Sequence, residues 1–121
     1  MNASTHTKFL IFNQQEFYAT IGDDAGLGKE ILAIALNELP ARIQNIQNCL
    51  KQPETNLLRI EIHDLKGIVG LLGCSDLHHQ LSSLKTIGQP INSDQLTVLH
   101  GLVERLKMLE KDLKLFSKME H

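Results

Sequence analysis

The residues best suited to chemistry lie together in one short segment. The chain carries the run His63-Asp64-Leu65-Lys66-Gly67, with a second glycine at position 70. A neutral imidazole is a nucleophile near its ordinary pKa of about 6.5. A lysine one helical turn after the histidine carries a fixed positive charge that can neutralise phosphoryl oxygens. If the segment is helical, this pattern indicates an imidazole that accepts a phosphoryl group.

The helix expected at residues 54–72 turns its apolar stripe away from His63. Apolar residues recur there at steps of 4, 3, 4 and 3, namely Leu58, Ile62, Leu65, Val69 and Leu72. At about 100° per residue, His63 points roughly 140° from the centre of this stripe. The same outward side carries Arg59, Lys66, Gly67 and Gly70. A second apolar flank predicts a helix that is buried on most of its circumference, with a small polar window at His63; this flank comprises Leu57, Ile60, Ile68 and Leu71.

The two glycines allow two interpretations. Each glycine in a helix interior costs about 1 kcal/mol relative to alanine, so a compensating role is expected. In the first interpretation, a neighbouring helix packs closely against Gly67 and Gly70. In the second, the missing side chains leave His63 open to an approaching partner.

The elements around this helix predict an all-α fold. Asn13 with Glu16 three residues later resembles a capping box for a short first helix, and Phe12 and Phe17 are placed to pack across it. A second helix is expected at about 25–50, with a kink at Pro40. Ser75 is expected to cap a fourth helix that stops at Gly88-Gln89-Pro90, and Asn92 or Ser93 a last helix at about 94–117. Because short turns join these helices, we expect an antiparallel four-helix bundle with the short N-terminal helix as a lid. No linker divides the chain, so residues 1–121 form one domain, of which 1–8 are expected to be a flexible tail.

Composition excludes several classes of protein. A net charge of −2 and 4% aromatic residues argue against nucleic-acid binding by phosphate contacts or base stacking. Two cysteines without CxxC spacing support neither a disulfide framework nor a zinc site. The sequence contains no membrane span, secretory signal or phosphate-binding glycine-rich loop. We therefore expect a cytoplasmic protein without a nucleotide site of its own.

The motif as a whole resembles that of a known family. His63-Asp64-Leu65-Lys66-Gly67, followed by Gly73 and Leu77, is similar to the H-x-L-K-G-x5-G-x3-L signature of histidine-containing phosphotransfer (HPt) domains. These are four-helix bundles that carry phosphoryl groups between receiver domains in two-component phosphorelays. The resemblance implies that His63 is the phospho-acceptor, Lys66 the phosphate-facing cation and Gly67 the gap that admits the partner.

Two positions depart from the family pattern. The residue before the histidine is commonly alanine in HPt domains and is Ile62 here. Family members often carry Gln or Glu on the next helix to orient the imidazole, and Lys85 occupies that position here. Lysine donates hydrogen bonds but accepts none, so Ser82 or a water is expected to orient the ring, with Lys85 as an alternative second cation for the phosphoryl group.

The resemblance implies a phosphocarrier that is not an enzyme in its own right. Its partners would be receiver domains of response regulators and hybrid sensor histidine kinases, and the receiver would supply the aspartate and the Mg²⁺. Docking is expected around His63, with Arg59, Ile60, Gly70 and Leu71 in the contact surface of a monomer. One alternative is a bundle that regulates a kinase or receiver by binding alone. Another is a metal-binding bundle that uses His63 with Glu61 or Asp64 and a histidine of a neighbouring helix.

Overall fold

A computed structural model of the chain describes residues 9–52, 55–84 and 91–119. Within these ranges all regular structure is helical, in five helices: α1 (Gln14–Ile21), α2 (Ala25–Lys51), α3 (Thr55–Leu71), α4 (Ser75–Ser82) and α5 (Ser93–Met119). In the same ranges no helix is both long and apolar enough to cross a membrane. The predicted tail at 1–8 lies outside the described residues.

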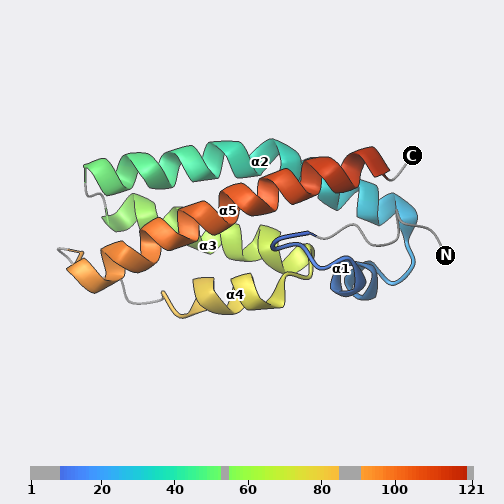
Figure 1. Cartoon of the computed structure of the whole chain (residues 1–121), viewed down its shortest axis with the longest axis horizontal. Helices are drawn as coiled ribbons and strands as arrows, with labels where there is room; N and C mark the ends of the chain where they lie inside the picture. Colours follow the sequence, from blue (N-terminus) through green and yellow to red (C-terminus); the bar gives the residue numbers. More distant parts are fainter. Residues whose placement is uncertain (1–8, 53–54, 85–90, 120–121) are drawn as a thin grey trace.

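The helices form the predicted bundle. Figure 1 shows α2 and α3 antiparallel, α4 turning back along α3, and α5 running along the length of α2. Leucines from the predicted stripes fill the core, and those of α3 (Leu58, Leu65) and α5 (Leu102, Leu106) are fully buried. The bundle has an apolar interior because each helix presents one stripe to it. The all-α class and the extra N-terminal helix are therefore confirmed.

The cap of α1 is half of the predicted capping box. The Asn13 side chain accepts a hydrogen bond from the Glu16 backbone N–H at 3.0 Å. The Glu16 carboxylate does not turn back to Asn13; it accepts from the Ser75 hydroxyl at 2.6 Å and from the Ser75 N–H at 3.3 Å. Ser75 is consequently the first residue of α4 and not its cap, because its hydroxyl is committed to α1 and Cys74 takes the cap position. The predicted Phe12–Phe17 contact is present, with ring centroids 5.5 Å apart.

Gly73 ends α3 as predicted and also positions α1. Its φ of +74° is in the left-handed region, and the Gly73 and Cys74 N–H groups donate to the Gly70 and Val69 carbonyls in a Schellman-type closure. A Cβ at this position would lie 2.6 Å from the Glu16 carbonyl oxygen. Glycine is therefore required twice, for the backbone conformation and for the close approach of α1.

The fourth helix is shorter than predicted. It ends at Ser82, because the Ser83 hydroxyl bonds back to the Gln80 carbonyl at 2.6 Å and the Ser83 N–H is shared between two carbonyls. The predicted stop at Gly88-Gln89-Pro90 lies outside the described residues. Asn92 caps α5 by accepting from the Gln95 N–H at 2.8 Å, which decides between the two caps proposed from sequence. Helix α2 continues through Pro40, whereas the kink there stays a prediction.

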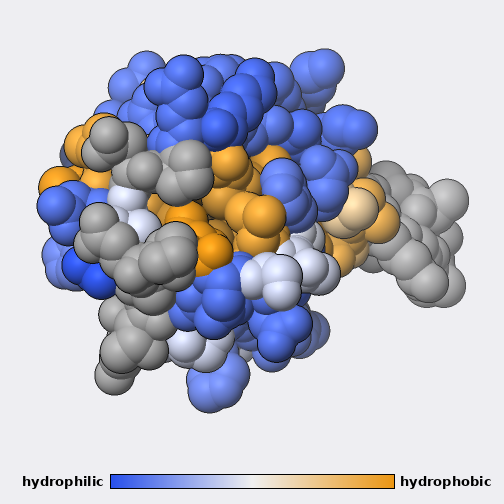
Figure 2. Space-filling view, turned by 90° about the vertical axis from the view of Figure 1, so that its left-hand side faces the viewer, coloured by the Kyte–Doolittle hydropathy of each residue, from blue (hydrophilic) through white to orange (hydrophobic). Residues whose placement is uncertain are grey.

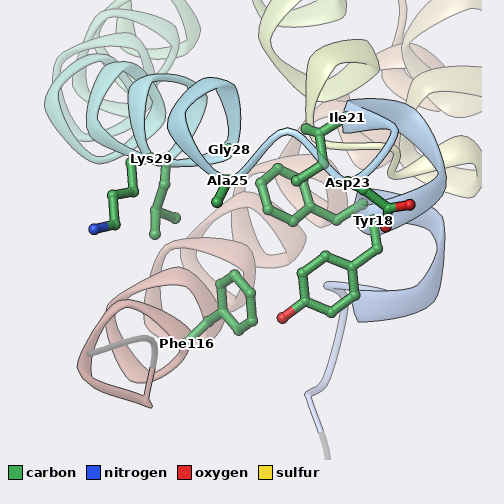
Figure 3. Close-up of a pocket in the computed structure, with 9 residues that line it drawn as sticks. Tyr18, Ile21, Asp23, Ala25, Gly28, Lys29 and Phe116 are labelled. Carbon is green, nitrogen blue, oxygen red and sulfur yellow. The ribbon is translucent and has the colours of Figure 1, made fainter.

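A pocket of about 430 Å³ lies where α1 meets α2 and α5 (Figure 3). It is lined by Phe17, Tyr18 and Ile21 of α1 and by Phe116 of α5, among others. Gly28 of α2 permits this packing, since a Cβ there would meet the Ile21 side chain at 2.8 Å. No lining residue belongs to α3 or α4, so the pocket is separate from His63. Figure 2 shows the opposite end of the bundle, where apolar side chains gather at the centre of the face within a polar surround.

A buried carboxylate holds the segment before α1 in place. Asp112 of α5 is 5% exposed and accepts three backbone hydrogen bonds, from Leu10 at 3.0 Å, Ile11 at 2.6 Å and Phe12 at 2.9 Å. Beside it, Phe12 packs on Phe116 with centroids 4.8 Å apart. The sequence reasoning missed Asp112, although its position one turn before Phe116, within the apolar stripe of α5, is a detectable signal.

We expect Asp112→Ala to lower the free energy of unfolding by about 2–4 kcal/mol. Hydrogen bonds to a charged acceptor contribute roughly 1.5–3 kcal/mol each, and the three N–H groups lose their partner together. Chemical denaturation followed by circular dichroism measures the change, with Glu104→Ala on the exposed face of α5 as the control. Equal midpoints for Asp112→Ala and wild type would show that the carboxylate contributes nothing to stability.

Candidate histidine site on α3

His63 stands on the outward face of α3, as predicted. Its side chain is 85% exposed, because the apolar stripe turns the opposite face of the helix toward the core. Together with Arg59 and Lys66 it lines a pocket of about 210 Å³, whose lining also includes Leu81 of α4 and Leu84 just after that helix. The structure thus brings together the histidine and two of the predicted cationic residues.

The two glycines on this face differ in their surroundings. A Cβ added to Gly67 meets no described residue within 4 Å, so none of the five described helices packs against it. A Cβ added to Gly70 would lie 3.4 Å from the ring of His78 on α4. The His78 ring therefore lies beside Gly70 at an ordinary contact distance that does not exclude a Cβ, whereas at Gly67 the missing side chain leaves open space one turn after His63.

The predicted burial of the second apolar flank is wrong for most of its residues. Ile68 is buried, but Leu57, Ile60 and Leu71 are each about half exposed. The reason is that α3 packs mainly between α2 and α4, with α1 at one end, so its outer face is covered by no described helix. The surface around His63 is consequently a wide face with apolar residues and not a small polar window.

Two residues were predicted from the sequence to act near the His63 ring, namely Ser82 and Lys85. Ser82 lies in a different groove, beside Gly70 and His78, and makes no hydrogen bond to His63 in the described part of the chain. Lys85 lies outside the described residues. The orientation of the imidazole by Ser82 or a water therefore stays a prediction.

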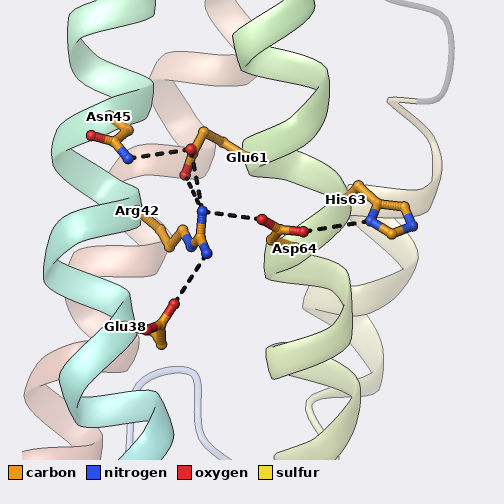
Figure 4. A network of polar contacts seen from close by, with 6 residues as sticks. All are labelled: Glu38, Arg42, Asn45, Glu61, His63 and Asp64. Carbon is orange, nitrogen blue, oxygen red and sulfur yellow. Dashed lines mark hydrogen bonds and ion pairs between the residues drawn. The ribbon is translucent and has the colours of Figure 1, made fainter.

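Sequence reasoning missed the polar network behind the site, which is centred on Arg42 of α2 (Figure 4). Its guanidinium forms ion pairs of 3.1 Å with three carboxylates, those of Glu38, Glu61 and Asp64. Asn45 adds a hydrogen bond of 3.2 Å to Glu61. The hydrogen bond with Glu61 is the main cause that raises the pKa of Arg42, and burial opposes it. A buried carboxylate such as Glu61 needs this partner, and its place in the apolar stripe of α3 is the signal that could have revealed the network.

Asp64 connects this network to the candidate nucleophile. One carboxylate oxygen lies 3.1 Å from Arg42, and the other lies 3.6 Å from Nδ1 of His63. Figure 4 shows the second ring nitrogen pointing away from the helix. The arrangement leaves Nε2 accessible to an incoming group.

The Cys74 thiol and the possible metal ligands are the other groups that could do chemistry. Burial raises the pKa of the Cys74 thiol to about 12, which keeps it protonated at neutral pH and hence a poor nucleophile. Across residues 9–52, 55–84 and 91–119, no group of three or more His, Cys, Asp or Glu side chains is placed to hold a metal ion. The metal-binding alternative therefore has no ligand set in this part of the chain.

Fold and site together define a helical bundle that presents an exposed histidine, flanked by cations, on one helix. Residues 30–109 match the family model of the Hpt domain, which is about two-thirds of the chain and includes His63. The chain therefore belongs to the Hpt domain family, whose members are histidine phosphocarriers of phosphorelays and interact with receiver domains. Comparison of the chain with the curated proteins and with the solved structures found no match.

Proposed function

We propose that His63 accepts a phosphoryl group from the phospho-aspartate of one receiver domain and passes it to the aspartate of another. The observation that carries the proposal is the exposed imidazole of His63 beside the open space at Gly67. Arg59 and Lys66 line the same pocket and place positive charge where phosphoryl oxygens would lie. The donor and acceptor receivers belong to hybrid sensor histidine kinases and response regulators.

The chemistry makes modest demands on this chain. The receiver supplies the aspartate and the Mg²⁺ that stabilises the charge of the transferring phosphoryl group. The carrier supplies a nucleophile, a cation and an accessible surface. Ile60 and Leu71 are half exposed beside this face and form the apolar rim of the proposed docking surface, with Arg59 and Gly70. We propose that the protein acts as a cytoplasmic monomer, since a docked receiver needs this face free.

The decisive experiment is incubation with a receiver domain carrying a ³²P-labelled phospho-aspartate. We expect label to move to this chain and to be labile in acid but stable in base, as a phosphoramidate bond is. Formation of a complex without transfer of label would support the alternative, a bundle that regulates its partner by binding alone. Absence of both transfer and complex with a panel of receivers would contradict both functions.

We expect Lys66→Ala to slow transfer from a phosphorylated receiver about tenfold. The ammonium lies one turn from His63 in the same pocket, and loss of one contact to the transferring group at an exposed site corresponds to about 1.4 kcal/mol of barrier. Rapid-quench measurement of label transfer checks the rate, with Lys111→Ala on the exposed face of α5 as the matched control. Lys85→Gln is expected to have a smaller effect; a larger loss there would assign the phosphate contact to the segment after α4.

A further inference from the structure

Among the described residues, Asp64 is the charged side chain that approaches a ring nitrogen of His63. Its ring is 85% exposed, and among the described residues Asp64 is the one acidic side chain that approaches it, at 3.6 Å from Nδ1. This separation is longer than a hydrogen bond, as is common for catalytic pairs before the reacting partner binds. The exposed imidazole would otherwise rotate freely and exchange its proton between two nitrogens.

The Asp64 carboxylate is itself held in place by an ion pair with a residue of another helix. Its second oxygen pairs with Arg42 at 3.1 Å, and Arg42 is anchored in turn by the buried Glu61. Consecutive helical residues diverge by about 100°, so His63 and Asp64 do not face each other by helix geometry alone. The ion pair with Arg42, a residue of α2, holds the Asp64 carboxylate at the edge of the His63 ring.

We propose that Asp64, held by Arg42, is the positioning residue of the phospho-acceptor, and that it selects the Nδ1–H tautomer of His63 so that Nε2 carries the reactive lone pair. This inference rests on the proposed function and replaces Ser82 as the ring-orienting group. A carboxylate at Nδ1 accepts that proton's hydrogen bond and thereby fixes both tautomer and ring orientation, as second partners of functional histidines generally do.

The same contact serves the transfer step. The Nε2 lone pair forms the N–P bond while the P–O bond to the receiver's aspartyl group breaks, and the aspartate leaves with that electron pair. Nδ1 keeps its proton, so the phosphorylated ring is a cation. Asp64 faces the proton-bearing edge of this cation with a negative charge, and the return transfer reverses the same bonds with the ring leaving as neutral imidazole.

The test compares Asp64→Ala with Glu38→Gln in the full chain. Glu38 pairs with Arg42 at the same 3.1 Å and is also partly exposed, but it makes no contact with His63, so its loss perturbs the network without touching the ring. ¹⁵N–¹H correlation spectra of the histidine rings report the tautomer of His63 before any phosphorylation. We expect Nδ1–H to predominate in wild type and Glu38→Gln, and the Nε2–H form usual for free imidazole to predominate in Asp64→Ala.

A second readout uses phosphoramidate, a small phosphodonor that needs no docking. We expect Asp64→Ala to be phosphorylated about threefold more slowly than wild type, and Glu38→Gln at the wild-type rate. The same tautomer and the same rate in Asp64→Ala as in wild type would overturn the positioning role while leaving the proposed function intact. If wild type takes up no label from any receiver, the proposed function fails, and the tautomer comparison still decides whether Asp64 orients the ring.

Discussion

Replacing His63 by glutamine is expected to abolish phosphoryl uptake while leaving the fold unchanged. The side chain is 85% exposed and packs into no core, so its removal costs the folded state little. Glutamine keeps a polar group of similar reach but has no nucleophilic nitrogen. Label transfer from a phosphorylated receiver should fall to background, whereas the thermal unfolding midpoint should stay within about a degree of wild type.

The chain offers a matched control for this substitution. His100 is an exposed histidine within helix α5, away from the α3 face, and His100→Gln makes the same chemical change there. We expect this variant to accept label at the wild-type rate. Transfer that survives in His63→Gln and disappears in His100→Gln would move the acceptor to α5. Survival in both variants would exclude each of these histidines as the acceptor.

The helices and the outward position of His63 followed from local patterns in the sequence. The stripe Leu58, Leu65 and Leu72 fixes which face of α3 is buried, and His63 is then outward by geometry alone. Asn13 caps α1 and Gly73 ends α3 through residues within five positions along the chain, so these two roles were predictable for the same reason. Such features need no knowledge of how the helices pack.

The features missed depend on contacts between distant segments. Arg42 and Glu61 are 19 residues apart, and Asp112 meets the segment before α1 across about 100 residues. Glu16 fits the local pattern of a capping box, but a tertiary partner 59 residues away, Ser75, takes its carboxylate. In each case a local rule identifies a polar group, whereas only the packed structure identifies its partner. The exposure of Ile60 and Leu71 likewise depends on which helices flank α3.

Gly67→Leu is expected to block transfer from a receiver and to raise the stability of the free protein. A side chain at this position enters open space beside His63, so it meets none of the described residues of the bundle but obstructs an approaching receiver. Replacing a helical glycine by leucine gains about 0.8 kcal/mol of helix propensity. Transfer should therefore fall at least a hundredfold while the unfolding midpoint rises by a few degrees. A packing defect would instead lower the unfolding midpoint together with transfer.

Gly101→Leu is the matched control, because Gly101 is also an exposed helical glycine whose added Cβ would meet no described residue within 4 Å, but it lies on α5. We expect the same gain in stability with transfer unchanged. Phosphoramidate separates docking from chemistry, since a donor of that size should still reach His63 in Gly67→Leu at close to the wild-type rate. Loss of the fold in Gly67→Leu would mean that Gly67 is a packing residue. Normal transfer from the receiver in this variant would mean that the partner docks elsewhere, because a leucine beside the imidazole and an in-line phospho-aspartate cannot occupy the same space.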